Sequence, residues 1–301
     1  MNEMKVLSLF DGISCGMVAL ERAGVPIEKY VAYEIDEDAI KVSKSNYPQI
    51  EHKGDVFEAK YIEGEFDLLI GGSPCTYWSI AKAGSNGKKG KRETTASGLG
   101  WDLFSQYVRA LKEVKPKYFL YENNASMSDD IRECISKELG RDPIEIDSVD
   151  FSAQHRRRLY WTNIPFSMQW NKSEVLFSDI LDKKSKYHYQ DFSKYKDTVR
   201  IRNNGMDIYF DTSGKGYYSQ QSRAKKINQK WNTVPTTSGK NNIWVSDYVL
   251  RYMTPIEAER LQTLPDNYTE CLSSKTKRIK GIGNGWTVDV IAHIFAGLIG
   301  D

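Results

Sequence analysis

The sequence predicts an α/β fold with a mostly parallel sheet, joined to a smaller and less regular domain. Over roughly the first 160 residues, short apolar runs rich in β-forming residues alternate with amphipathic helical stretches. From residue 166 to 250 this alternation gives way to short polar segments with scattered aromatic residues. The 301 residues include 40% hydrophobic and 27% charged residues, which excludes wholesale disorder.

The first elements are a buried strand at 5–10, which ends at the Asp11-Gly12 turn, and a helix at 15–24 with Gly24 as its C-cap. Near the other end, Thr254 at the N-cap position and Pro255 at N1 open a helix. The remaining predicted strands are 30–36, 52–58, 66–75, 117–123, 144–150 and 158–163; the helices are 37–48, 100–116, 128–139, 254–265 and 288–300.

Residues 166–250 form a basic insert, with 14 Lys and Arg against 8 Asp and Glu, in a chain of net charge only +2. Aromatic residues are interleaved with these charges, as is typical of a polyanion-binding surface. They are Tyr187, Tyr189, Tyr195, Tyr217, Tyr218, Trp231 and Trp244.

The sequence supports neither a membrane protein nor a secreted protein. No run approaches the roughly 18 apolar residues of a membrane span, so no membrane partner is expected. The N-terminal MNEMKVLSLFDG lacks the charge and apolar pattern of a signal peptide, and the four cysteines are widely spaced. We therefore expect reduced thiols and a cytoplasmic location.

The turn after the first strand is the first candidate binding feature, since ligands of open α/β sheets bind at the carboxyl ends of strands. Glu34 ends the second strand 22 residues after Gly12, where a carboxylate can bind a ribose diol, and Asp55 ends the third. The dinucleotide pattern GxGxxG is incomplete because Ser14 occupies the second glycine position. An adenosine ligand without a pyrophosphate is favoured, and S-adenosylmethionine is such a ligand.

The second feature is Cys75, on a Gly/Pro loop that follows a buried strand. A thiol there lies where substrates bind, and its thiolate is a nucleophile when cations stabilise it. Glu122-Asn123 ends another strand, and Arg156 and Arg158 can face one site if they alternate on one strand. A Lys-rich loop at 82–100, whose most flexible part is 84–100, can close over a substrate and bring Lys82, Lys88, Lys89 and Lys91 to it.

These residues resemble the motifs of the C5-cytosine DNA methyltransferases over nearly the whole chain. Eight motifs occur in the family's order, and their residues are close to those of the family's de novo branch. They are VLSLFDGISCGMVALERAG, YEIDEDA, GDVFE, GGSPCTYWS, YENNASM, QHRRRLYWTN, RYMTPIEAERLQTLPDNY and GIGNGWTVDVIAHI.

The resemblance implies a Rossmann-like, S-adenosylmethionine-dependent methyltransferase fold, with S-adenosylhomocysteine as product and no metal. The catalytic domain would be 1–165, completed by 281–301. The target-recognition domain would be 166–280, with a variable part at 166–250 and a motif helix within 251–265. Double-stranded DNA is the expected partner, a restriction endonuclease acting on the same site is a further candidate, and a monomer is expected rather than a dimer.

The resemblance also implies a role for each site residue. Cys75 would attack C6 of a flipped cytosine, Glu122 would contact N3 and the exocyclic amine, Asn123 would hold the Pro74-Cys75 loop, and Arg158 would steady the adduct with Arg156 nearby. The implied cofactor set is Phe10, Asp11, Gly12, Ile13, Ser14, Cys15, Glu34, Ile35, Asp55, Val56, Pro74, Asn284, Gly285 and Trp286.

Three departures from the family pattern stand out. Ser14-Cys15 replaces a Gly-rich turn, Thr76 replaces the common Gln after the nucleophile, and Asn124 replaces Val after Glu-Asn. Thr76 and Asn124 are expected near the flipped base.

Three alternatives stay open: a tRNA cytosine-C5 methyltransferase, a catalytically silent DNA-binding regulator, and a transferase of a group other than methyl. The tRNA branch carries a Cys-Phe-Thr signature in its recognition region, whereas 166–250 contains no Cys.

Overall fold

A computed structural model describes residues 3–79, 92–185, 189–191, 199–202, 205–208, 225–226, 228–234, 236, 242–246 and 249–299. Two compact units divide the chain. The first comprises Met1–Asp147, Arg157–Trp170 and Val288–Asp301, and the second Ser148–Arg156 and Asn171–Thr287. Residues 148–156 and 281–287, which the sequence analysis placed with the catalytic domain, thus belong to the second unit.

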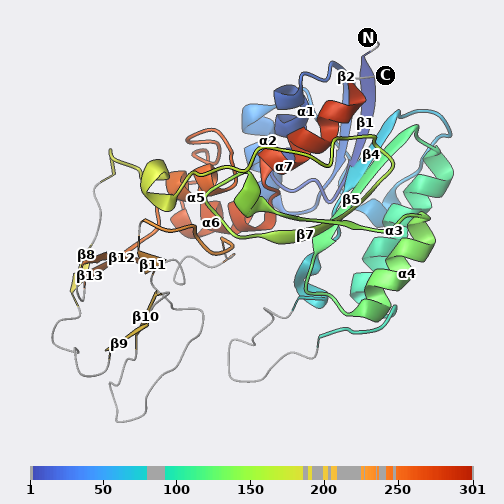
Figure 1. Ribbon diagram of the computed structural model, residues 1–301. Coiled ribbons are helices and arrows are strands. Elements are labelled where there is room, and N and C mark those ends of the chain that lie inside the picture. Colours follow the sequence, from blue (N-terminus) through green and yellow to red (C-terminus); the bar gives the residue numbers. More distant parts are fainter. Residues whose placement is uncertain are drawn as a thin grey trace. The chain divides into compact units, whose positions relative to one another are not determined.

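A seven-stranded sheet of order β3-β2-β1-β4-β5-β7-β6 forms the centre of the first unit (Figure 1). Only β7 runs against its neighbours, so the predicted mostly parallel sheet is confirmed. The strands are β1 (Met4–Leu9), β2 (Ile27–Tyr33), β3 (Glu51–His52), β4 (Leu68–Gly71), β5 (Tyr118–Asn124), β6 (Ile144–Asp147) and β7 (Arg157–Thr162).

Helices cover both faces of this sheet, with α1, α2 and α7 on one side and α3 and α4 on the other (Figure 1). They are α1 (Cys15–Ala23), α2 (Glu37–Asn46), α3 (Leu99–Val114), α4 (Asp129–Leu139) and α7 (Val288–Phe295). Short 3-10 turns lie at Val56–Glu58, Cys75–Tyr77 and Ala296–Leu298. Gly24 ends α1 in the left-handed conformation at φ 76°, as predicted for a C-cap glycine.

The core of the first unit follows from strand periodicity. Leu7 and Leu9 of β1 belong to a buried cluster that also contains Phe104 and Tyr107 of α3 and Ile131 of α4. The intervening side chains of β1 point to the opposite face. This packing fixes the carboxyl ends of β1, β4 and β5, from which the candidate site residues extend.

The second unit contains α5 (Pro255–Leu261), α6 (Lys275–Asn284) and 3-10 turns at Ser148–Asp150 and Phe177–Ile180. Its two small sheets have the orders β11-β12-β13-β8 and β10-β9. The strands are β8 (Tyr189–Asp191), β9 (Val199–Arg202), β10 (Gly205–Ile208), β11 (Lys225–Lys226), β12 (Asn242–Ser246) and β13 (Val249–Tyr252). No helix in the described part of the chain has the length and apolarity needed to cross a membrane.

A separate hydrophobic cluster stabilises the second unit. Trp231 is 3% exposed and packs against Phe177 with ring centroids 4.5 Å apart. The inclusion of Trp231 in a polyanion-binding surface was therefore wrong. Thr254 and Glu257 form a reciprocal capping box at the start of α5, which confirms the predicted helix start.

Candidate functional site

The turn after β1 adopts a left-handed backbone at Phe10 (φ 58°), Gly12 (φ 58°) and Ser14 (φ 60°). The Glu34 carboxylate, beyond the end of β2, fixes this turn because Oε2 accepts from the Gly12 amide at 2.8 Å. Its Oε1 accepts from the amides of Ile35 and Asp36, both at 2.8 Å. A carboxylate offers about four acceptor positions, so roughly one remains for a ligand hydroxyl.

The Asp11 side chain stabilises the turn through hydrogen bonds with three hydroxyl groups. Its Oδ1 accepts from the hydroxyls of Ser8 and Tyr30, both at 2.6 Å, and its Oδ2 accepts from Ser14. Burial raises the pKa of Asp11 above its ordinary value, although the three hydroxyls oppose this shift. The side chain of Asp11 is thus engaged within the protein.

Ser14 explains one departure from the Gly-rich pattern. It is fully buried, and its hydroxyl lies 2.6 Å from that of Ser43, which in turn lies 3.0 Å from Nε2 of His52. The neighbouring Ile13 and Cys15 are also buried, at 1% and 3% exposed. The side chains of these three residues therefore pack inside the protein and support the turn. A Cβ added at Gly12, in contrast, would meet no atom within 4 Å.

Two exposed apolar side chains lie beyond the ends of the neighbouring strands β2 and β3. Ile35 is 70% exposed and Phe57 is 49% exposed. Asp55 accepts from the Phe57 amide at 2.9 Å and so caps the short turn that presents this ring, while Val56 is buried. The sequence analysis missed Phe57; its position two residues after a capping Asp was the available signal. Exposed apolar groups after the ends of these two strands offer surface for an apolar or aromatic part of a ligand.

Cys75 begins the 3-10 turn that follows β4, and its thiol is half-buried. Pro74 and Thr76 beside it are exposed. The Asn123 amide of β5 donates to the Ser73 carbonyl at 3.1 Å, directly before Pro74. The structure thus brings Asn123 to the loop of Cys75, where it anchors the backbone.

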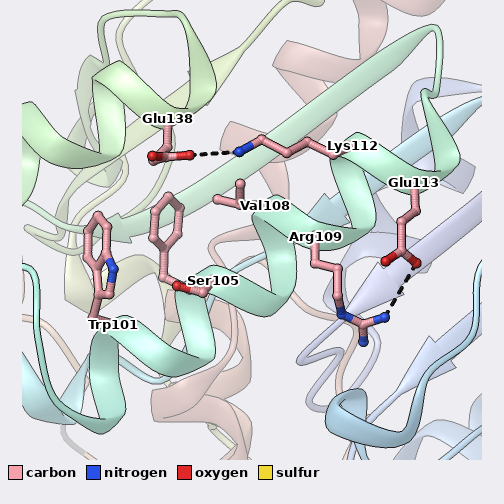
Figure 2. A pocket seen from close by; sticks show the side chains of 8 residues that line it. Trp101, Ser105, Val108, Arg109, Lys112, Glu113 and Glu138 are labelled. Atoms are coloured by element: carbon pink, nitrogen blue, oxygen red, sulfur yellow. Dashed lines mark hydrogen bonds and ion pairs between the residues drawn. The ribbon is translucent and has the colours of Figure 1, made fainter.

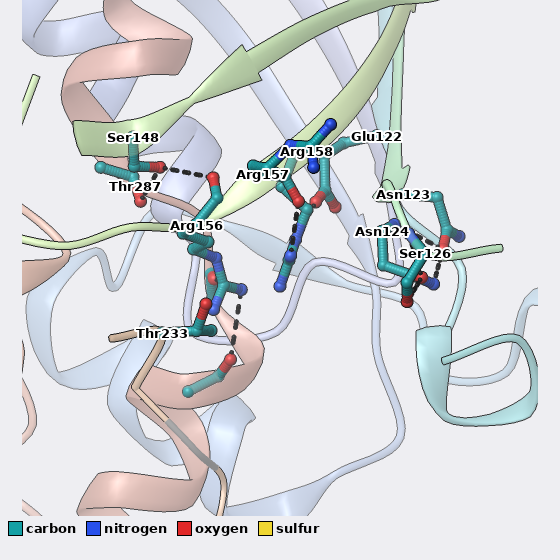
Figure 3. A network of polar contacts seen from close by, with 12 residues as sticks. Glu122, Asn123, Asn124, Ser126, Ser148, Arg156, Arg157, Arg158, Thr233 and Thr287 are labelled. Carbon is teal, nitrogen blue, oxygen red and sulfur yellow. Dashed lines mark hydrogen bonds and ion pairs between the residues drawn. The ribbon is translucent and has the colours of Figure 1, made fainter. Parts of the chain in front are cut away.

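Glu122 and Arg158 meet across β5 and β7, with Arg158 Nε 2.9 Å from Glu122 Oε1 (Figure 3). Both side chains are largely buried, 11% exposed for Glu122 and 14% for Arg158. Arg157 instead pairs with Glu145 at 2.5 Å in an exposed position. Glu122 and Asn123 are consecutive on one strand, so their side chains project to opposite faces of it.

Arg156 does not share this strand, because β7 begins at Arg157. Its buried guanidinium belongs to the second unit and donates to the carbonyls of Gly283 and Gly285. The periodicity argument that paired Arg156 with Arg158 therefore does not hold.

The last three cofactor candidates also lie in the second unit. Asn284 is exposed at the end of α6, Gly285 is buried as its C-cap, and Trp286 is half-buried. The Gly285 carbonyl accepts from Arg156 at 2.8 Å and from Gln262 at 3.1 Å.

Several other predicted features lie elsewhere or outside the described residues. Lys82, Lys88, Lys89 and Lys91 are outside them, as are Tyr187, Tyr195, Tyr217 and Tyr218. A depression of about 440 Å³ opens on α3, but the charged side chains along it are paired with one another, Lys112 with Glu138 and Arg109 with Glu113 (Figure 2). The described residues contain no cluster of three or more His, Cys, Asp or Glu placed to hold a metal ion.

Comparison with known proteins extends this picture. The orphan methyltransferase M.SPRI of Bacillus phage SPR is 40% identical over 126 residues, 41% of this chain but only 27% of the phage protein. The type II methyltransferase M.FnuDI of Fusobacterium nucleatum is 27% identical over 97% of this chain and 93% of its own. The solved structure of the methyltransferase EhMeth of Entamoeba histolytica shares the fold, with a TM-score of 0.70 at 16% identity, covering 99% of this chain and 98% of that one.

The family model described as C-5 cytosine-specific DNA methylase matches residues 4–139 and 150–300. This match spans both compact units and includes each candidate catalytic residue. The chain therefore belongs to the C-5 cytosine-specific DNA methylase family.

Proposed function

We propose that the protein methylates cytosine at C5 in double-stranded DNA. The observation that carries this proposal is that three features of the family's chemistry occur at the ends of neighbouring strands in this protein. A half-buried thiol at Cys75 follows β4, Asn123 anchors its loop from β5, and a largely buried Glu122–Arg158 pair lies beside Asn123 in sequence.

The chemistry requires a nucleophile because the aromatic cytosine ring is not nucleophilic at C5. The Cys75 thiolate adds to C6, which forms an S–C6 bond and places negative charge on C5. Glu122 donates a proton to N3 and accepts a hydrogen bond from the exocyclic amine, which neutralises the charge that the addition places on the ring, and Arg158 holds the Glu122 carboxyl group in place. S-adenosylmethionine, when bound, would supply the methyl group to C5 and would leave as S-adenosylhomocysteine. A base then removes the C5 proton, and the electron pair expels the thiolate.

The residues after β1, β2 and β3 would hold the adenosine part of the cofactor. Glu34 retains roughly one acceptor position for a ribose hydroxyl, and Ile35 and Phe57 offer apolar surface for the adenine. Phe10, Gly12, Asp55 and Pro74 complete the proposed site in the first unit. Asn284, Gly285 and Trp286 are proposed as cofactor residues from the family resemblance.

The target base must leave the helical stack because C6 cannot be reached within a duplex. We propose that the basic residues of 166–250 neutralise DNA phosphates and that this segment reads the target sequence. The type II methyltransferase names among the relatives support a cognate restriction endonuclease as a further partner. We also propose a monomer located in the cytoplasm of a bacterial or phage-infected cell.

Expression with a plasmid in a bacterial strain that lacks cytosine methylation tests this function. Bisulfite sequencing should show protected cytosines in one short sequence context. Cys75→Ala should abolish protection but retain S-adenosylmethionine binding, whereas Cys134→Ala, on α4, is the matched control and should behave as wild type. Unprotected DNA from a folded protein that binds the cofactor would contradict the proposal, and tRNA would then be assayed.

A further inference from the structure

A buried polar cluster lies beneath the backbone of Pro74 and Cys75. Ser73, Tyr121 and Asn123 are 3%, 0% and 1% exposed. The hydroxyls of Ser73 and Tyr121 are 2.7 Å apart, and Asn123 Nδ2 donates to the Tyr121 hydroxyl at 3.1 Å and to the Ser73 carbonyl at 3.1 Å. The nucleophile loop therefore depends on the direction in which the Asn123 amide points.

Two donors of Asn124, one on its backbone and one on its side chain, help to fix that direction. The Asn123 Oδ1 accepts from the backbone amide of Asn124 at 2.9 Å and from its side-chain Nδ2 at 3.0 Å. If the Asn123 amide were reversed, its NH₂ group would face these two donors and its oxygen would face the Ser73 carbonyl. Both contacts would be repulsive, so only one orientation satisfies every partner.

Asn124 is itself fixed from its other side. It is 4% exposed, so its side chain is occupied within the protein rather than projecting into solvent beside Cys75. Its Oδ1 accepts from the amide of Ser126 at 3.1 Å and from the Ser126 hydroxyl at 2.7 Å (Figure 3). The carbonyl of Ser126 then accepts from Arg92 at 3.0 Å. A continuous chain of hydrogen bonds thus runs from Arg92 to Ser73.

We propose that Asn124 is a positioning residue for the nucleophile, acting through Asn123 on the Ser73–Cys75 backbone. Valine, which the family pattern places at this position, would keep the backbone donor to Asn123 but would remove the Nδ2 donor and the acceptor for Ser126. This protein therefore holds Asn123 with a side-chain contact that a valine cannot make. Tyr121 adds a second contact, since its hydroxyl binds both Ser73 and Asn123. The inference rests on the proposed function of Cys75.

The main test compares wild type with Asn124→Val. A side-chain hydrogen bond contributes about 0.5–1.5 kcal/mol, so loss of the positioning contact should lower kcat about 2–10-fold. KM for duplex DNA and for S-adenosylmethionine should not change, because Asn124 contacts neither in this proposal. Asn46→Ala, which removes a side-chain hydrogen bond to Val42 on α2, is the control and should leave kcat unchanged.

A double-mutant cycle identifies the route. Ser126→Ala should lower kcat by a smaller factor, and Asn124→Val with Ser126→Ala should lower it no further than Asn124→Val alone. Multiplicative effects of the two substitutions, or a kcat for Asn124→Val equal to wild type, would overturn the inference. Tyr121→Phe gives an independent check, because it keeps the packed ring and removes only the hydroxyl; its kcat should also fall.

A readout that needs no turnover separates this inference from the proposed function. The alkylation rate of Cys75 by iodoacetamide, followed by peptide mass spectrometry, should rise about 2–5-fold in Asn124→Val, as expected for loss of one restraining hydrogen bond. The rate at Cys134 should stay constant. If Asn124→Val changes the alkylation rate but the wild type has no methyltransferase activity, the proposed function alone is refuted. If Asn124→Val changes neither the alkylation rate nor kcat of an active protein, the positioning role alone is refuted.

Discussion

Arg158 and Arg157 are adjacent on β7, yet their substitution should have very different consequences. Arg158 pairs with Glu122 at 2.9 Å, with both side chains at most 14% exposed. Arg157 pairs with Glu145 at 2.5 Å, with side chains 66% and 40% exposed. The shorter ion pair is therefore the more solvated one, and burial rather than distance should determine the cost of breaking each pair.

The expected magnitudes follow from this difference in burial. Removing one partner of a fully buried pair costs about 3–5 kcal/mol, because the other charge stays desolvated. Since Glu122 retains slight exposure, Arg158→Ala should lower the free energy of unfolding by about 2–4 kcal/mol. The Arg157–Glu145 pair is screened by water, so Arg157→Ala should lower it by about 0–1 kcal/mol.

Urea unfolding followed by tryptophan fluorescence measures both variants, and Trp161 on β7 provides a buried probe within the same sheet. Glu122→Gln combined with Arg158→Ala should recover part of the loss, because no uncompensated carboxylate remains. Arg158→Ala should also lower methyl transfer strongly, whereas Arg157→Ala should not. Equal destabilisation by the two arginine substitutions, or a larger loss from Arg157→Ala, would refute the reasoning.

Three further predictions concern packing, pH and salt. In Gly71→Ala the new Cβ would lie 2.8 Å from the Leu9 carbonyl oxygen, so the free energy of unfolding should fall by about 1–3 kcal/mol. The thermal unfolding midpoint should fall with it, and an unchanged midpoint would contradict this prediction. Burial lowers the pKa of His52 in the folded protein, so the unfolded state binds a proton first as pH falls below about 6.5. Wild type should therefore lose more stability between pH 7 and 5 than His52→Gln, and parallel curves would be the contrary result. The affinity for duplex DNA should fall steeply with salt as counterions are released; an affinity insensitive to salt would exclude the basic segment as the DNA surface.

Most of the first unit could be predicted from the sequence because its elements follow local rules. The β1 run, Gly24 and the alternation of strands and helices each carry a signal within a few residues. The helix at Lys275–Asn284 was not predicted, because Gly281 and Gly283 interrupt its pattern. Ile282 and Ile279 are nevertheless fully buried or nearly so, which shows that tertiary packing stabilises this helix.

The candidate site was predictable in its residue identities but not in its contacts. Motif order placed Cys75, Glu122 and Arg158 in the sequence, and the Glu122–Arg158 pair arises from the register of β5 against β7, which no local pattern reveals. The expectation that Asn124 lies near the flipped base did not anticipate its hydrogen bonds to Asn123 and Ser126. Arg156 was expected on the same strand as Arg158, but that strand begins at Arg157, one residue later. Strand boundaries are the feature that sequence patterns define least well.

The most direct test of the proposed mechanism is to trap the bond between Cys75 and cytosine. A duplex in which fluorine replaces hydrogen at C5 of the target cytosine cannot lose a proton from C5 after methyl transfer, so the thiolate cannot be expelled. With S-adenosylmethionine present, mass spectrometry should find a one-to-one covalent complex of protein and methylated DNA, joined at Cys75. A complex joined at another residue, or none from a protein that methylates the unmodified duplex, would contradict the role assigned to Cys75.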